Sequence, residues 1–217
     1  MASASHPGGG WLKGALAQEE DIFMRSTYDL SLSESMHLDT KRNWKYPIPE
    51  TGGIYSPNVF IFRDNSKNGY AVWDYENCSY LDFVAVAAVR KPEVTNGMMS
   101  RRETYITLEK MRTMLRIALM NNHESILLGA FGCGAFGNPP RQIANLFLRV
   151  FSEAEFKGRF KNIDFAILDT RNEGNFEIFK RILCPKGKEP ANTTGRRGYV
   201  AGKERSFPGY PQVPWYW

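Results

Sequence analysis

Two acidic residues stand next to each other shortly after a run of three glycines. The run Gly8 to Gly10 follows Pro7, and seven residues separate it from Gln18 to Glu20. Glycine has no Cβ, so it accepts positive φ values and lets another group approach the backbone closely. Because carboxyl groups give and take protons, we expect this stretch to hold a ligand and to do acid–base chemistry on it. The alternative is a disordered leader followed by acids that complement a helix dipole.

A second glycine-rich stretch predicts an anion site. The apolar run that begins at Ile126 breaks into four glycines, Asn138 and two prolines, and a helical pattern of apolar residues follows from Ile143. In a strand, loop and helix of this kind, backbone N–H groups and the positive end of the helix dipole face one point. A phosphate or diphosphate is the expected ligand. The alternative is a tight turn that binds nothing.

Two other motifs compete for this loop. Gly132 to Gly137 satisfies G-x-G-x-x-G, but that dinucleotide pattern belongs to the first strand of a doubly wound domain, and here about 125 residues precede it. A P-loop is excluded because no Gly-Lys-Ser/Thr follows. Cys133 lies where a helix N-terminus can activate a thiol, but no histidine is near it in sequence, so a nucleophilic role is not favoured.

Together, the two motifs resemble the microbial-type poly(ADP-ribose) glycohydrolase family, a branch of the macrodomains. The segments Pro57–Asp64, Leu81–Val89 and Asn175–Leu183 are also similar to that family, so the resemblance covers roughly residues 2 to 183. It implies cleavage of the O-glycosidic ribose–ribose bond of poly(ADP-ribose), or of a related ADP-ribose linkage, with release of ADP-ribose. The implied partner is ADP-ribose or poly(ADP-ribose), either free or on modified proteins, and no cofactor or metal is implied.

The resemblance also implies roles for individual residues. Glu20 matches the catalytic glutamate, which protonates the departing ribose oxygen and then activates water. Glu19 is expected to bind ribose hydroxyls and Gln18 to brace the loop. The helix N-terminus expected here would lower a carboxyl pKa, whereas a general acid needs a raised one. The distal ribose is expected to lie against Gly8, Gly9 and Gly10, with Phe136 holding it, and the diphosphate along Gly132, Cys133, Gly134, Ala135, Phe136, Gly137 and Asn138.

The implied fold class is α/β, a macrodomain-like three-layer sandwich with a mixed central sheet and helices on both faces. Macrodomains place further elements before the glycine run, so the fold is expected to be N-terminally shortened. Periodicity predicts helices over residues 19–32, 103–121, 140–155 and 173–183, and strands over 59–63, 80–89, 125–129 and 163–168. We expect a catalytic domain over 1–183 and a basic tail rich in proline, glycine and aromatics, loosely docked or disordered, over 184–217.

Composition narrows the class of protein. Of the net charge of +5, the tail carries +4, so a basic nucleic-acid face on the domain is not expected. Three widely spaced cysteines argue against a disulfide framework and predict an intracellular, cytoplasmic or nuclear protein. The three histidines lie far apart, which argues against a zinc site, and no apolar stretch is long enough to span a membrane. We expect a monomer.

Two functions outside hydrolysis stay open from the sequence. The chain can be a module that binds ADP-ribose without turnover, or a fragment that folds incompletely. The short segment before the glycine run motivates both alternatives.

Overall fold

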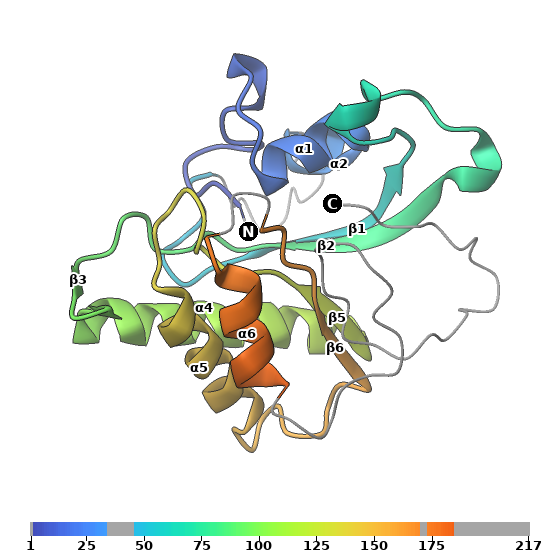
Figure 1. Ribbon diagram of the computed structural model, residues 1–217. Helices are drawn as coiled ribbons and strands as arrows, with labels where there is room; N and C mark the ends of the chain where they lie inside the picture. The colour runs from blue at the N-terminus through green and yellow to red at the C-terminus, as the bar shows by residue number, and fades with distance from the viewer. Residues whose placement is uncertain (1, 34–45, 170–172, 185–217) are drawn as a thin grey trace. The chain divides into compact units, whose positions relative to one another are not determined.

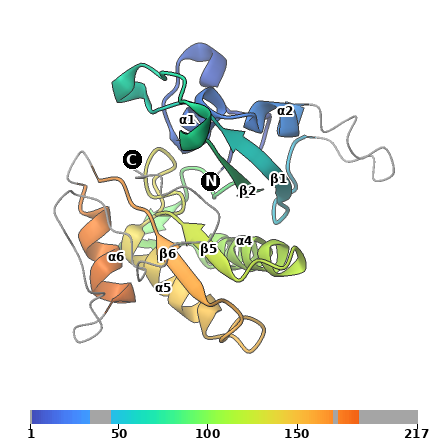
Figure 2. The same ribbon diagram turned by 90° about the vertical axis from the view of Figure 1, so that its right-hand side faces the viewer.

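The computed structural model describes residues 2–33, 46–169 and 173–184. These residues form two compact units, one up to residue 87 and one from residue 88 onward. Figures 1 and 2 show the elements of both units in two views. Each unit is described by itself below.

The first unit combines two short helices with an antiparallel strand pair. The strands pair from Ile54↔Ala85 to Ile61↔Ser79, and their register shifts between Ser56 and Val59. Pro57 lies at this shift and lacks an N–H, so an irregularity in the ladder is expected there. The elements are η1 (Trp11–Lys13), α1 (Gln18–Arg25), α2 (Tyr28–Ser33), β1 (Ile54–Ile61), η2 (Ser66–Asn68), η3 (Tyr75–Asn77) and β2 (Ser79–Ala85).

The core of the first unit joins the helices to the strand pair. Phe23 of α1 packs edge-on against Tyr28 of α2, with ring centroids 5.2 Å apart. Leu32 is fully buried, and Val59 is 1 % exposed. This cluster holds α1 in place through Ile22 and Phe23, and the acids lie in the first turn of the same helix. Its buried members are Ala2, Ile22, Phe23, Tyr28, Leu32, Ile48, Val59, Ile61 and Ala85.

The predicted single helix over residues 19–32 is wrong at one point. Ser26 is extended, with φ of −148° and ψ of 177°, and it forms an isolated bridge with Ile61. Its Oγ donates to the carbonyl of Ile22 at 2.6 Å and accepts from the N–H of Tyr28 at 3.1 Å. Serine often makes such local bonds in competition with helical ones, so the pattern splits into α1 and α2.

The second unit is built around a strand–helix–strand segment. Strands β5 and β6 pair in parallel from Ser125↔Asn162 to Leu128↔Phe165, and α5 connects them. Parallel strands need a crossover of this kind. The elements are β3 (Val94–Thr95), β4 (Met98–Met99), α4 (Arg101–Met120), β5 (Ser125–Leu128), α5 (Pro140–Phe151), β6 (Asn162–Phe165) and α6 (Asn175–Leu183).

Helix α5 is the centre of this unit and contacts both α4 and α6. Its residues Ile143 and Val150 are fully buried, and Phe147 packs edge-on against Phe165 of β6. Gln142, in its first turn, accepts from the buried N–H of Met99 at 2.7 Å and donates to Thr104 Oγ1 at 2.9 Å. The start of α5 is therefore fixed to β4 and α4 as well as to the strands.

The α/β class predicted from the sequence is confirmed, and both strand senses occur. Among the strands that the structure describes, pairing is two by two, in the pairs β1–β2, β3–β4 and β5–β6. Strand β2 ends at Ala85 and not at Val89 as predicted. The carbonyls beyond Ala85 have other partners: that of Val86 accepts the N–H of Ala2, and that of Val89 accepts Asn138 Nδ2. Helix α5 ends at Phe151 and β6 at Phe165, both earlier than predicted. The predicted tail lies outside the described residues beyond Cys184.

Candidate functional site

The three glycines of the first unit form a turn that side chains could not occupy. Gly8 and Gly9 have φ of +68° and +53°. A Cβ on Gly8 would lie 2.5 Å from the ring of Trp11, and one on Gly9 would lie 2.5 Å from Glu20 Oε1. Positive φ and these close approaches both require glycine. Within the unit the groups that approach these glycines are side chains, and one of them is the acid Glu20. The ligand that the sequence predicts at this turn stays a prediction.

Glu19 is buried against the glycine turn. It is 4 % exposed, and its two carboxyl oxygens accept backbone N–H groups of Gly8 at 3.2 Å and of Ser3 at 2.5 Å. Its side chain thus ties two segments of backbone to the first turn of α1. This is a clamp on the loop, whereas the sequence predicted an orienting contact to ribose hydroxyls.

Glu20, the next residue, is half-buried and also reaches the turn. Its Oε1 accepts the N–H of Gly10 at 3.1 Å. Helix α1 has no side-chain cap at Ala17, so neither acid is used to cap its own helix. Gln18 opens α1 and is exposed. The two acids therefore share one glycine turn, and Glu20 is the less buried of the two.

Burial separates the chemistry of the two acids. It raises the pKa of Glu19 to about 7, while the N–H groups of Ser3 and Gly8 favour the ionised form and act against it. Burial also raises the pKa of Tyr28 and Tyr46, and the nearby charge of Glu19 adds to it. The pKa of Glu19 is thus raised, because the loss of solvation outweighs the hydrogen bonds from the Ser3 and Gly8 N–H groups.

The second unit holds the predicted anion loop between β5 and α5. Gly132 has φ of +74°, and a Cβ there would meet Asn138 Nδ2 at 2.5 Å and Ala88 Cβ at 2.8 Å. Asn138 is 2 % exposed, and its Nδ2 donates to the carbonyls of Val89 at 2.7 Å and Gly132 at 3.1 Å. The asparagine thus pins the loop from inside.

The outer part of this loop presents backbone N–H groups. Gly134, Ala135 and Gly137 are exposed and Phe136 is half-buried. Within the described part of the chain, the N–H groups of Gly134, Ala135 and Phe136 have no hydrogen-bond partner. Helix α5 follows with Pro140 at its first position and no side-chain cap. Unsatisfied N–H groups beside a helix N-terminus are the arrangement that binds phosphate.

Cys133 has a structural place in the loop. It is buried, its N–H donates to the carbonyl of Ala130 at 3.0 Å, and burial raises the pKa of its thiol to about 12. A thiol with this pKa is protonated at neutral pH, so it is a poor nucleophile. Cys133 therefore contributes to the packing of the predicted loop.

Metal and membrane features were sought over the same residues. In residues 2–33, 46–169 and 173–184, no three His, Cys, Asp or Glu side chains come together as they would around a metal ion. None of the described helices combines the length and apolar character that crossing a bilayer requires. None of the three cysteines, which all lie in this part of the chain, forms a disulfide.

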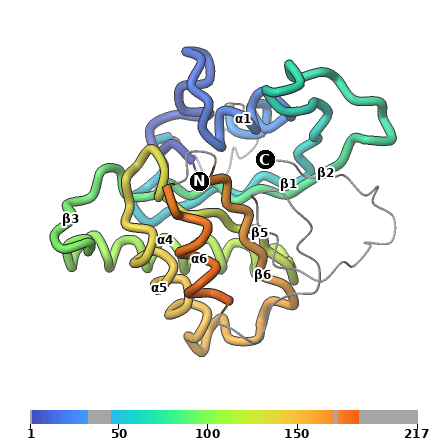
Figure 3. The backbone as a smooth tube through the Cα atoms, in the orientation of Figure 1, coloured from blue at the N-terminus to red at the C-terminus, as the bar shows by residue number. Residues whose placement is uncertain are grey.

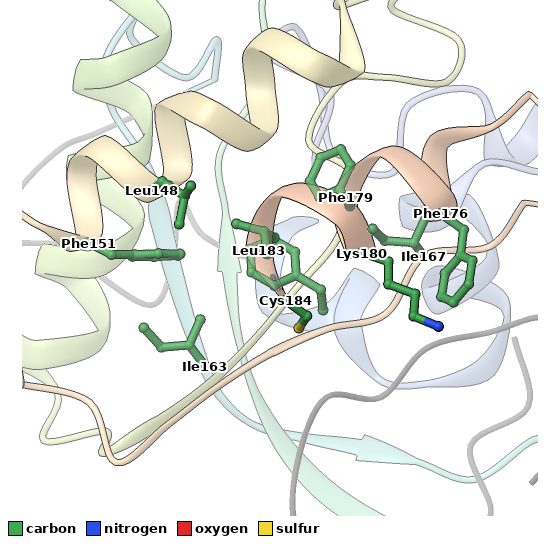
Figure 4. Close-up of a pocket in the computed structure, with 10 residues that line it drawn as sticks. Leu148, Phe151, Ile163, Ile167, Phe176, Phe179, Lys180, Leu183 and Cys184 are labelled. Carbon is green, nitrogen blue, oxygen red and sulfur yellow. The ribbon is translucent and has the colours of Figure 1, made fainter. Parts of the chain in front are cut away.

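A separate apolar pocket lies in the second unit and contains none of the predicted site residues. Its volume is about 160 Å³, and Figure 4 shows aromatic and aliphatic side chains of α5 and α6 around it. Lys180 is the charged residue of its lining. It offers no convergent polar groups of the kind that orient a ligand.

Sequence reasoning missed two backbone contacts, one at the glycine turn and one at the anion loop. Ser3 donates its N–H to Glu19 from 16 residues away, and no pattern in the sequence links them. Lys91 donates its N–H to the Phe136 carbonyl at 2.8 Å, which places the segment after Val89 beside the anion loop. Figure 3 shows these two segments of the second unit side by side.

Comparison with known proteins places the chain in a family. Residues 1–64 match the family described as microbial-type PARG, catalytic domain. A search of curated proteins gave no significant match. Among solved structures, the poly(ADP-ribose) glycohydrolase of Thermomonospora curvata bound to the inhibitor ADP-HPD is 31 % identical with a TM-score of 0.68, over 83 % of this chain and 67 % of that one.

The enzyme of Deinococcus radiodurans is similarly close. Its complex with ADP-ribose is 29 % identical to this chain with a TM-score of 0.65, over 84 % of this chain and 72 % of that one. A variant of the same enzyme with ADP-ribose is 30 % identical over the same shares. These identities, the shared fold and the profile match agree with the two motifs. The chain belongs to the microbial-type poly(ADP-ribose) glycohydrolase family.

Proposed function

We propose that this protein hydrolyses the O-glycosidic ribose–ribose bond of poly(ADP-ribose), or a closely related ADP-ribose linkage, and releases ADP-ribose. The observation that carries the proposal is the pair of adjacent carboxyls bound to one triple-glycine turn, with Glu20 half-exposed and Glu19 buried. The structures of relatives bound to ADP-ribose or to ADP-HPD support it. Three cysteines without a disulfide support an intracellular place of action.

The proposed reaction needs one carboxyl that faces the substrate. Glu20 gives its proton to the departing ribose oxygen as the glycosidic bond breaks and an oxocarbenium-like sugar forms. The resulting carboxylate then accepts a proton from water as the water oxygen attacks the anomeric carbon, which restores the acid. Gly10 N–H, which donates to Glu20 Oε1, fixes the carboxyl during both steps.

Glu19 has a supporting role in this scheme. Because both of its oxygens accept backbone N–H groups and it is 4 % exposed, it acts on the glycine turn. It keeps the backbone of Gly8 against α1, where the absence of a Cβ at Gly8 and Gly9 leaves room for Trp11 and Glu20. The turn is thereby organised before substrate arrives, which is how an enzyme reduces the cost of orientation.

The second unit supplies the anion site of the proposal. The N–H groups of Gly134, Ala135 and Phe136, together with the N-terminus of α5, offer donors to a diphosphate. Ordinary protein ligands of phosphate include such backbone groups, and no metal is needed for the contact.

The experiment compares Glu20→Gln with Asp29→Asn, a change that removes one negative charge from the first turn of α2. Release of ADP-ribose from poly(ADP-ribose) is measured by chromatography, and ADP-ribose affinity by calorimetry. Loss of a general acid and base lowers turnover by about 10² to 10⁴, so Glu20→Gln is expected to lose turnover and keep binding, and Asp29→Asn to keep both.

Two outcomes would change the proposal. If Glu20→Gln keeps wild-type turnover, Glu20 is not the catalytic acid. If the wild-type chain binds ADP-ribose but releases none from the polymer, the protein is a binding module and not a hydrolase.

A further inference from the structure

Arg25, the last residue of α1, carries its charge inside the first unit. Its side chain is 5 % exposed, and its guanidinium lies over the ring of Trp73, 5.8 Å from the centroid. Its Nε donates to the carbonyl of Arg63 at 3.3 Å, and its Nη1 forms an ion pair with Asp21 at 3.4 Å. A buried charge is tolerated where it is paired and hydrogen-bonded, and Arg25 meets both conditions.

These partners of Arg25 belong to different elements. Asp21 lies in the first turn of α1, four residues before Arg25, and residues at this spacing share one face of a helix. Arg63 lies just after β1, and its N–H and that of Phe62 donate to the Arg25 carbonyl at 3.2 Å and 3.0 Å. The backbone and the side chain of Arg25 therefore join both ends of α1 to the chain that leaves β1.

The first turn of α1 depends on contacts of its own side chains for its orientation. Ala17, which precedes it, provides no side-chain cap. Its two glutamates hold the turn against the glycines, and Asp21 holds it through Arg25. Successive side chains of a helix point about 100° apart, so Glu20 and Asp21 leave the turn in different directions. A rotation of α1 about its axis would strain both sets of contacts.

Small rotations of α1 matter for the proposed chemistry. The end of a side chain lies roughly 6 Å from the helix axis, so a rotation of about 10° moves it by about 1 Å. A misplacement of about 1 Å can cost about 10²-fold in rate. Stability alone explains the ion pair poorly, because the cost of taking two charges out of water offsets their attraction. The geometric restriction that the pair imposes on α1 is the more direct consequence.

We propose that Arg25 is a positioning residue for the hydrolysis. Through its ion pair with Asp21 it fixes the rotation of α1, and it thereby holds the Glu20 carboxyl against the Gly10 N–H. The proposal rests on the proposed function, which makes Glu20 the catalytic acid, and it assigns Arg25 no contact with the substrate. An effect on the rate of bond cleavage, and none on the affinity for ADP-ribose, is therefore expected when the pair is removed.

The test removes each charge of the pair in turn. Arg25→Met keeps an unbranched side chain beside Trp73 and removes the positive charge, and Asp21→Asn removes the negative charge at almost the same size. Arg112→Met is the matched control, because Arg112 also pairs with an acid, Glu153 at 2.6 Å, but in the second unit. Circular dichroism and urea unfolding of the full chain give the folded fraction of each variant, to which all rates are referred.

Turnover and affinity are measured separately, by release of ADP-ribose from poly(ADP-ribose) and by calorimetric titration of ADP-ribose. Arg25→Met and Asp21→Asn are each expected to lower kcat about tenfold or more and to leave KM and Kd unchanged. The double variant is expected to lose no more than either single variant, because both changes remove one contact. Arg25→Lys keeps the charge and is expected to recover most of kcat. Arg112→Met is expected to keep the wild-type kcat.

Two further readouts separate positioning from a general effect of charge or stability. Arg25→Met and Asp21→Asn change the local charge in opposite directions, so an effect of charge would shift the pH–rate profile in opposite directions. Positioning instead lowers the maximum of the profile in both variants. In the Glu20→Gln background, Arg25→Met is expected to cause no further loss of kcat, since Arg25 acts through Glu20.

The outcomes distinguish this proposal from the proposed function. Wild-type kcat in folded Arg25→Met, or a further loss on top of Glu20→Gln, would overturn the positioning role and leave the hydrolase standing. Opposite shifts of the two pH–rate profiles with unchanged maxima would do the same. If Arg25→Met does not fold, Asp21→Asn decides alone, and wild-type kcat in it would overturn the positioning role. A wild-type chain that releases no ADP-ribose from the polymer would overturn both proposals.

Discussion

Glu19 and Glu20 lie next to each other in the first turn of α1 but have different environments. Successive residues of a helix point about 100° apart, so Glu19 turns into the unit while Glu20 stays at its edge. Both oxygens of Glu19 are used for backbone N–H groups, and one oxygen of Glu20 is. The buried clamp Glu19 therefore lies next to Glu20, the proposed catalytic group, and burial raises the pKa of Glu19.

Glu19→Gln is expected to change how stability depends on pH. Burial raises the pKa of Glu19 from 4.5 to about 7, so the folded state binds a proton more readily than the unfolded state between these values. The stabilisation is fully present below 4.5 and is lost as the pH rises to about 7. Urea unfolding between these values is expected to show the wild type losing on the order of 2 to 3 kcal/mol.

The Gln variant is expected to lack this slope. In this variant the side-chain NH2 group faces one of the two backbone N–H groups, of Ser3 or Gly8, that a Glu19 oxygen accepts in the wild type. One donor then lacks an acceptor, so the variant should be less stable than the wild type at low pH by about 1 to 3 kcal/mol. A wild-type chain whose stability rises through the same window would show that Glu19 is ionised throughout.

Gly9→Ala is expected to affect activity more than stability. A Cβ at Gly9 would lie 2.5 Å from Glu20 Oε1, so the carboxyl has to move. Gly14→Ala is the matched control, because Gly14 has φ of +78° but a Cβ there meets nothing within 4 Å. Both variants should lose about 1 kcal/mol to backbone strain. Only Gly9→Ala should lose most of its kcat, and equal kcat in the two variants would contradict the contact with Glu20.

Much of this residue-scale picture follows from the sequence, and the rest depends on folding. Three glycines and two acids at a fixed spacing predicted that the turn and the acids belong to one site, and the structure brings them together; the ligand and the acid–base chemistry stay predictions. The sequence could not assign the buried acid, because the donor Ser3 and the packing of Phe23 and Tyr28 around the turn are tertiary. Predictions that Glu19 and the glycines contact ribose remain predictions.

At the scale of elements, helix α5 places the anion loop, and its first turn is held from two sides. Gln142 joins it to the Met99 N–H and to Thr104. Gln142→Leu is expected to destabilise the protein by about 1 to 3 kcal/mol, because the buried Met99 N–H loses its acceptor. Asn145→Leu, on the exposed face of the same helix, should change the urea midpoint little. A Gln142 variant as stable as the Asn145 variant would show that this bond does not secure α5.

The presence of helices and strands was predicted better than the residues at which they begin and end. The apolar periodicity of α4 and α5 predicted both helices, since each buries one face and the repeat of 3.6 residues is visible in the sequence. The break at Ser26 was not visible, because serine is common in helices and the competing bridge to Ile61 is a tertiary contact. The early end of β2 has a similar cause, since the Ala2 N–H and the Asn138 side chain, both far away in sequence, bind the carbonyls of Val86 and Val89.

At the scale of the whole molecule, the predicted class is confirmed and charge is spread unevenly. The fold is α/β, and the relatives with which it shares that fold are poly(ADP-ribose) glycohydrolases. The basic tail that the sequence predicted beyond residue 183 falls outside the described residues, apart from Cys184, so its role stays a prediction.

ADP-ribose is expected to stabilise the folded chain against heat. A ligand that binds only the native state, present at about 100 times its Kd, adds about 2.7 kcal/mol. The thermal midpoint should therefore rise with ADP-ribose concentration in the wild type and in Glu20→Gln alike. An unchanged midpoint at saturating ligand would mean that the native chain does not bind it.

One measurement tests the central claim most directly. ADP-ribose is titrated into the purified wild-type chain by calorimetry, poly(ADP-ribose) is added to a fresh portion of the same preparation, and released ADP-ribose is counted by chromatography. The account predicts saturable binding and release of ADP-ribose that continues over many turnovers per protein molecule. Saturable binding with no release from the polymer would contradict it.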